Sequence, residues 1–169
     1  MTETTENGVE PKPPMNRREY MEAVARGEYP DSPLVPNAYL SSSPGYDGVS
    51  ETRGTIENLC LLPVKSVSLL FSRDGTERAG HYHKTDWHFA LILEGQAVYH
   101  WRKPGEVIRR VRIFAWDMIF SPPMVEHLFV FEKDTRMVTM AKNIRTHEEH
   151  EADVVRVKFF EDVRANRVG

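Results

Sequence analysis

The sequence of 169 residues has very little cysteine and no long apolar stretch. Cys60 is the single cysteine, which excludes a disulfide within the chain and a cluster of thiolate metal ligands. No run of 18 apolar residues occurs, so no membrane-spanning helix is expected. Residues 1–10 lack the basic start and apolar stretch of a secretory signal, and Lys and Arg form no block. We therefore expect a cytoplasmic protein with neither a nucleic acid nor a membrane as its partner.

The composition changes along the chain, whose length predicts a single domain. Residues 1–14 are polar and predict a disordered tail. Residues 15–53 predict a short helix, with Asn16 as its N-cap, followed by an irregular proline-rich arm. Residues 54–143 carry the expected β-domain, and residues 144–169 form a C-terminal extension.

Short apolar runs, separated by turn signals such as Asp74-Gly75 and Pro104-Gly105, fill the region 54–143. Short strands at this spacing are typical of an all-β sandwich or barrel. The expected strands are Ile56–Leu62, Ser66–Phe71, Trp87–Leu93, Ala97–Trp101, Val107–Phe114, Met118–Phe120, His127–Phe131 and Met137–Ala141. After them we expect a charged turn or helix start at Thr146–Asp153 and a last strand or helix edge at Val154–Phe160.

Four of the seven histidines have an informative spacing. His81 and His83 are two apart, so on a strand both side chains face the same way. A hairpin would bring His88 back beside them, and His127 opens a later strand. If these strands line a small barrel, four imidazoles meet at one end of its interior. Because imidazole is the commonest ligand of first-row divalent metals, the pattern predicts a metal site.

These residues resemble the two sequence motifs of the cupin family. The first motif has a glycine, two histidines two apart, a glutamate and a second glycine, and Gly80–His83, His88 and Gly95 match its spacing. The second motif has an aspartate, a proline and a last histidine, which match Asp117 and the segment Pro122–His127. The resemblance implies the cupin double-stranded β-helix, a jelly-roll barrel, with a metal bound by His81, His83, His88 and His127.

The sequence departs from the cupin motifs where it has His88 in place of the glutamate ligand. Four neutral imidazoles would leave the charge of a divalent metal uncompensated, so the site should attract an anionic substrate or hydroxide. An all-nitrogen ligand set suits Zn, Fe, Ni, Co or Cu better than Mn or Mg. Alternatively His88 does not bind, and the site is a three-histidine centre or holds no metal.

A second resemblance points to sugar chemistry. The segment His81–Thr85 with Phe89 and Leu91–Gly95, followed by Met137–Met140, is similar to the C-terminal domain of capsular-polysaccharide nucleotide-sugar reductases. Those domains are metal-binding epimerases.

Neighbouring side chains are candidates for catalysis and substrate binding. Tyr99 and Glu126 are candidate general bases, and a carboxylate at Asp86 or Glu126 could hold an imidazole N–H. The candidate substrate-binding residues are Tyr99, Trp101, Arg112 and Phe129. Plainer interpretations apply to His100 (at the surface or a dimer face), to His147 and His150 (on a solvated charged segment) and to Cys60 (a small core residue).

The leading functional hypothesis is a metal-dependent isomerase, epimerase or lyase that acts on a small, oxygen-rich metabolite. In it the metal polarises a carbonyl and a base removes the neighbouring proton. An iron-dependent dioxygenase would use the same ligands, and a cupin that only binds a small ligand is a third alternative. We also expect a homodimer, because a small open barrel leaves sheet edges and apolar strand faces to cover.

Overall fold

The computed structural model describes residues 15–36, 49–158, 161, 163 and 165. The expected disordered tail, residues 37–48 of the expected arm and most of the chain after residue 158 lie outside this description. Among the described residues, no helix has the length and apolar character needed to cross a membrane.

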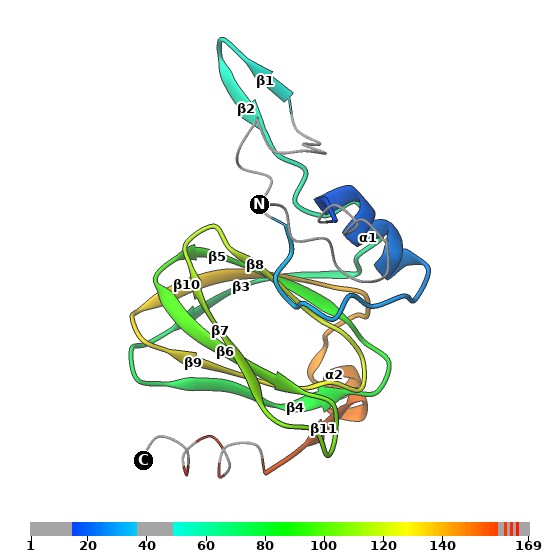
Figure 1. Cartoon of the computed structure of the whole chain (residues 1–169), viewed down its shortest axis with the longest axis vertical. Helices are drawn as coiled ribbons and strands as arrows, with labels where there is room; N and C mark the ends of the chain where they lie inside the picture. The colour runs from blue at the N-terminus through cyan, green and yellow to red at the C-terminus, as the bar shows by residue number, and fades with distance from the viewer. Residues whose placement is uncertain (1–14, 37–48, 159–160, 162, 164, 166–169) are drawn as a thin grey trace, which may run out of the picture.

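Two antiparallel sheets face each other and form a jelly-roll barrel, as Figure 1 shows. One sheet has the strand order β3 (Ser66–Ser72), β10 (Thr135–Ala141), β5 (His88–Glu94) and β8 (Met118–Ser121). The other has the order β11 (Val154–Arg156), β4 (Glu77–His83), β9 (Glu126–Phe131), β6 (Gln96–Arg102) and β7 (Arg109–Phe114). The all-β jelly-roll fold expected from the sequence is confirmed.

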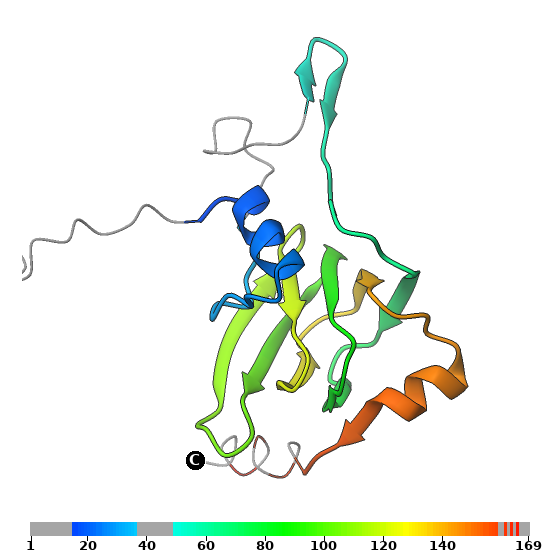
Figure 2. The same ribbon diagram turned by 90° about the vertical axis from the view of Figure 1, so that its right-hand side faces the viewer.

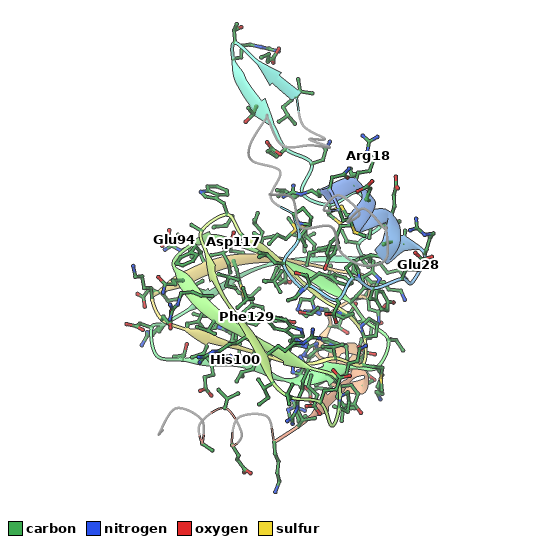
Figure 3. All side chains as sticks on the ribbon, viewed as in Figure 1. Arg18, Glu28, Glu94, His100, Asp117 and Phe129 are labelled. Atoms are coloured by element: carbon green, nitrogen blue, oxygen red, sulfur yellow. The ribbon has the colours of Figure 1, made fainter. Side chains whose placement is uncertain are left out.

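Alternating apolar side chains from both sheets fill the barrel interior. They form one buried cluster of Ala90, Ile92, Ala97, Tyr99, Ile113, Ile119, Phe129, Phe131 and Met137. Figure 3 shows Phe129 between the two sheets. Since successive residues of a strand point to opposite faces, the same strands present a second set of side chains to the outside of the barrel.

The N-terminal helix α1 (Arg17–Ala25) covers the outer face of the four-stranded sheet. The side chain of Asn16 accepts a hydrogen bond from the backbone of Glu19, whose own side chain accepts one from the backbone of Asn16. This capping box starts the helix where the sequence predicts it. Its buried side chains Tyr20 and Met21 belong to the same cluster as Phe89 and Phe120, among others.

The residues that follow α1 lie against the exposed edge of β8. The backbone N–H of Phe120 donates to the carbonyl of Pro33 (2.8 Å), and the N–H of Val35 donates to the carbonyl of Met118 (2.9 Å). This part of the expected arm therefore satisfies the hydrogen-bonding groups of an edge strand of its own chain.

The expected strand Ile56–Leu62 is wrong. Only Ile56 lies in a strand, β2 (Gly54–Ile56), which pairs with β1 (Val49–Glu51) in a hairpin that extends away from the barrel (Figure 2). Leu59, Cys60 and Leu62 pack against the core under α1 without joining a sheet, which explains their apolar character. Conversely, β4 carries no apolar run, although the spacing of its histidines placed it on a strand.

The structure also resolves the expected C-terminal elements. Thr146 caps a short helix, α2 (His147–Asp153), and accepts a hydrogen bond from the backbone of Glu149. Helix α2 runs directly into β11, which pairs with β4. The pairing fixes α2 beside the end of β4 that carries the histidines.

We predict that the protein is a dimer whose interface includes the outer face of β3. Val67, Leu69 and Phe71 are 66, 69 and 48% exposed on this edge strand, and contiguous apolar surface of this kind marks an interaction site. Light scattering should give a dimeric mass for the wild type and a lower mass for Leu69→Lys. Val107→Lys, at another exposed apolar position, is the matched control and should remain dimeric. A monomeric wild type at micromolar concentration would contradict the prediction.

Candidate metal centre

Three strands bring four imidazoles together at one end of the barrel. His81 and His83 end β4, His88 begins β5, and His127 lies opposite His81 in the pairing of β4 with β9. The ring centres of His81 lie 4.9 Å from His83 and 5.0 Å from His127, and His88 lies 5.4 Å from His83. Glu94, at the far end of β5, marks the opposite end of the barrel in Figure 3.

The ring nitrogens separate these histidines into a group of three and a fourth ring. His81, His83 and His127 each offer one nitrogen, and these nitrogens all lie within 4.8 Å of one another. His88 does not belong to this group. Among the described residues the geometry therefore corresponds to the three-histidine alternative, with His88 beside it.

Hydrogen bonds set which nitrogen of His83 and His127 carries the proton. Nδ1 of His83 lies 3.1 Å from Oδ2 of Asp153, and Nδ1 of His127 lies 3.1 Å from the carbonyl oxygen of Val125. Burial opposes ionisation of Asp153, but hydrogen bonds from Thr85 hold the pKa of its carboxyl below the usual range. Because a carboxylate and a carbonyl can only accept, both Nδ1 atoms donate. The lone pair of each neutral ring is therefore on Nε2.

The histidine rings are neutral at neutral pH because they are buried. Burial, reinforced by the neighbouring imidazoles and Arg145, lowers the pKa of His81, His83 and His127 to about 3. Burial and Arg145 also lower the pKa of His88 well below its ordinary value. A neutral imidazole is the form that binds a metal.

Arg145, which the sequence analysis missed, contacts two of these rings. Its Nη2 donates to Nδ1 of His88 (2.9 Å) and lies 3.3 Å from Nε2 of His83. The guanidinium is fixed by Asp86, which accepts from Nη2 (2.9 Å) and Nε (3.0 Å). The expected role of Asp86 thus changes, since it holds the arginine, while Asp153 holds an imidazole. Arg145 follows β10, and nothing in the sequence around it indicates that its side chain reaches the histidines of β4 and β5.

His150 also lies at the site, although the sequence analysis placed it on a solvated segment. Its ring centre is 5.8 Å from that of His81 and 5.6 Å from that of His83, because the pairing of β11 with β4 brings α2 to this end of the barrel. Burial and Arg145 lower its pKa, so the ring is neutral. His147, on the same helix, is exposed.

These histidines line a cavity of about 200 Å³ that also includes Phe129 and Arg145. Tyr99 is fully buried behind His127, with its ring stacked on that imidazole at 6.1 Å and its hydroxyl 2.8 Å from Oγ of Ser121. Burial raises the pKa of Tyr99, so its phenol keeps its proton at neutral pH. The structure therefore gives no support to a general-base role for Tyr99.

Two further candidates lie on the outer face of the five-stranded sheet, away from the imidazoles. Glu126 lies opposite Arg102 in the pairing of β9 with β6, and the two side chains form an ion pair. Arg112 forms two hydrogen bonds with Glu132, at 2.8 and 3.0 Å. The alternation of side chains along β7 and β9 turns both away from the cavity.

His100 corrects another expectation. It was expected at the surface or at a dimer face, but it is only 6% exposed. It lies opposite Leu128 in the strand register, on a sheet face where Val163 packs against Leu128 and Val130. Val157 and Val163 therefore cover part of this face.

The fold and the residues at its open end define the class of protein: a cupin-fold barrel with a histidine cluster. No known protein-family model and no curated protein sequence matches the chain. The likeness to solved structures shows the cupin fold.

Three of these structures are sugar-related proteins. A variant of the 3,4-ketoisomerase QdtA from Thermoanaerobacterium thermosaccharolyticum, in complex with TDP-4-keto-6-deoxyglucose, has a TM-score of 0.54 and 14% identity over 71% of this chain and 89% of its own. The 3'-monoepimerase ChmJ from Streptomyces bikiniensis, in complex with dTDP-quinovose, has a TM-score of 0.54 and 15% identity over 65% of each chain. The capsular polysaccharide assembling protein CapF from Staphylococcus aureus has a TM-score of 0.50 and 18% identity over 70% of this chain and 38% of its own.

The buried histidines predict that the metal-free protein loses stability in weak acid. The pKa values of His81, His83 and His127 are about 3 in the folded chain, against an ordinary value of 6.5. Between pH 3 and pH 6.5 the unfolded chain therefore binds more protons than the folded chain. The contribution of each neutral ring to the free energy of unfolding is complete above pH 6.5. It declines by about 1.4 kcal/mol per pH unit as the pH falls towards 3.

Urea unfolding between pH 7 and pH 5, in the presence of a chelator, measures this loss. His81→Gln should reduce the slope of the unfolding free energy against pH, and His147→Gln, which alters an exposed ring, should leave it as in the wild type. Equal stability of the wild type at pH 7 and pH 5 would contradict the assignment of neutral, buried rings.

Proposed function

We propose that the protein is an isomerase or epimerase that acts on a sugar-related keto substrate, and that His81, His83 and His127 hold one divalent transition metal. The observation that carries the metal assignment is the orientation of the imidazoles. Asp153 and the Val125 carbonyl hold the Nδ1 protons, which is how metal-binding histidines are usually fixed by their neighbours. An all-nitrogen ligand set suits Zn, Fe, Ni, Co or Cu.

The substrate class is supported by the proteins of like fold. One of them holds TDP-4-keto-6-deoxyglucose and another dTDP-quinovose, and the first is a ketoisomerase. A keto sugar has a carbonyl next to a C–H bond, which is the arrangement that isomerisation or epimerisation by proton transfer needs. A metal bound here would act as a Lewis acid that polarises the carbonyl and acidifies the adjacent C–H.

His150 is the candidate base for this proton. Its neutral ring lines the same cavity as His81 and His83 and, unlike them, is absent from the group that could hold a metal. It takes the proton from the carbon beside the carbonyl. In isomerisation it returns this proton to the former carbonyl carbon, while the hydroxyl proton of the first carbon passes to the former carbonyl oxygen. In epimerisation a second acid, such as a water molecule, protonates the first carbon from the opposite face.

Arg145 supplies positive charge to the oxygen that becomes negative during this transfer. Its ion pair with Asp86 fixes the guanidinium beside the histidines, so no reorganisation is needed as the charge develops. The Nε2 lone pair of His83 can serve either Arg145 or a metal.

The metal assignment predicts different outcomes for the four histidines. Protein purified without added metal and analysed for elements should contain one transition metal per chain. His81→Ala, His83→Ala and His127→Ala should lose it, because each removes a ligand. His88→Ala should keep it and serves as the control. If all four variants keep one metal, the site is elsewhere, and if His88→Ala also loses it, the four-ligand site is right. Iron accompanied by oxygen uptake would favour the dioxygenase alternative.

The base assignment predicts a loss of proton exchange in His150→Gln. NMR in heavy water should detect deuterium entering TDP-4-keto-6-deoxyglucose beside its carbonyl in the presence of the wild type. His150→Gln should slow this exchange by roughly 10²- to 10⁴-fold, the usual contribution of a general base, with its metal content unchanged. His147→Gln, three residues earlier on α2, should exchange like the wild type. Equal rates in both variants and the wild type would exclude His150 as the base.

A further inference from the structure

His88 presents an N–H group to the histidine cavity, and the proposed metal site does not use it. Nη2 of Arg145 donates to Nδ1 of His88 at 2.9 Å. Because a guanidinium can only donate, Nδ1 holds the lone pair and the ring proton of His88 is on Nε2. This is the opposite tautomer to that of His83 and His127, whose lone pairs are on Nε2. His88 therefore offers a donor where these two rings offer acceptors.

Thr139 supplies a hydroxyl group close to His88. In the pairing of β10 with β5, Thr139 lies opposite Ala90, which is two residues after His88. The side chains of Thr139 and His88 therefore share the inner face of the barrel as diagonal neighbours. Diagonal neighbours are roughly 7–8 Å apart, which allows a ligand atom between them to contact both side chains. Both residues line the histidine cavity.

Neither group has a hydrogen-bond partner within the described part of the chain. His88 is 4% and Thr139 is 5% exposed, and no hydrogen bond reaches Nε2 of His88 or the hydroxyl of Thr139. Neither atom is sealed in the core, so both remain in contact with the space of the cavity that they line. Because an unpaired polar group in the interior is costly, two such groups at one cavity indicate a ligand atom that accepts from them.

Packing does not explain the hydroxyl of Thr139. The nearest inward positions on β10 are Met137 and Ala141, and the residue opposite on β5 is Ala90. All three are buried and apolar. Valine has nearly the same shape as threonine and suits a strand interior without a polar atom to satisfy. The hydroxyl at this position therefore indicates a polar contact with a ligand.

We propose that Nε2 of His88 and the hydroxyl of Thr139 bind the hydroxyl oxygen next to the substrate carbonyl, and so select an α-hydroxy ketone. The inference deepens the proposed function and rests on it for the identity of the substrate. In that function the carbonyl oxygen already has the metal and Arg145 as its partners. The neighbouring hydroxyl oxygen has two lone pairs and can accept from both members of this donor pair. In isomerisation it becomes the new carbonyl oxygen, which accepts the same two hydrogen bonds, so the donor pair holds the reacting carbons before and after the proton transfer.

Calorimetric titration with two sugars tests the donor pair. The probes are TDP-4-keto-6-deoxyglucose and its 3-deoxy analogue, which lacks the hydroxyl beside the carbonyl. The parent protein is the His150→Gln variant, in which the sugar should be converted slowly during the measurement. The parent should bind the complete sugar roughly 10-fold or more tightly than the analogue, because the analogue leaves both donors without an acceptor.

Two substitutions of Thr139 separate hydrogen bonding from packing. Thr139→Val keeps the shape and removes the hydroxyl, so the preference for the complete sugar should fall roughly 3- to 10-fold. Thr139→Ser keeps the hydroxyl and should keep the preference. A packing role would give the reverse result, with a harmless valine and a harmful serine. Thr55→Val removes a threonine hydroxyl at an exposed position of the β1–β2 hairpin and should bind both sugars like the parent.

His88 has a corresponding pair of variants. His88→Gln keeps an acceptor for Arg145 and an N–H for the sugar, and should retain the preference. His88→Leu removes both groups and should reduce the preference roughly 3- to 10-fold. Because Thr139→Val tests the same oxygen independently, the test remains decisive if His88→Leu fails to fold.

The outcomes for the donor pair and for the proposed function differ. A parent that shows no preference between the sugars, or a full preference retained in Thr139→Val, would overturn the donor pair. Loss of metal from His88→Ala would also overturn it, since Nε2 of His88 would then be a ligand. If the preference responds as expected but the wild type exchanges no proton in heavy water, the proposed function fails and the donor pair remains.

Discussion

The hydrogen bonds of one carboxylate organise the site. Asp153 accepts from Nδ1 of His83, from the backbone and hydroxyl of Thr85 and from the backbone of Asp86. These bonds join the end of α2 to the turn between β4 and β5. They keep the carboxylate ionised and hold the proton of His83 on Nδ1. The same contacts bring His150 to the cavity, so both the proposed ligand and the proposed base depend on Asp153.

The positive charge of Arg145 sets the electrostatics around the histidines. Its ion pair with Asp86 is largely buried, and a cation in this place lowers the pKa of every nearby imidazole. Burial is the main cause of these low pKa values and the cation adds to it, so the rings stay neutral and keep their lone pairs for a metal or for the arginine itself. His88 stands where the cupin motif has a glutamate, and its Nδ1 accepts a hydrogen bond from Arg145.

Two cavities of different character share one wall. The histidine cavity of about 200 Å³ is lined mainly by imidazoles, whereas a second cavity of about 430 Å³, between the segment after α1 and the barrel, is lined by aromatic rings and prolines. Tyr99 and the loop that carries Val125 separate them.

The sequence by itself determined the fold and the main histidines. Alternation within strands and the spacing of His81, His83, His88 and His127 are local properties, so they predicted a jelly roll with imidazoles at one end. The tertiary structure decided which groups join them. Arg145 and His150 reach the site because β10 pairs with β5 and β11 pairs with β4, across separations of tens of residues that no local pattern records. Glu126 and Arg112 lie on the outer sheet face because the register of β6 with β7 and β9 turns them away from the cavity. Leu59, Cys60 and Leu62 are apolar because they pack beneath α1, and an apolar run alone cannot distinguish that packing from a strand.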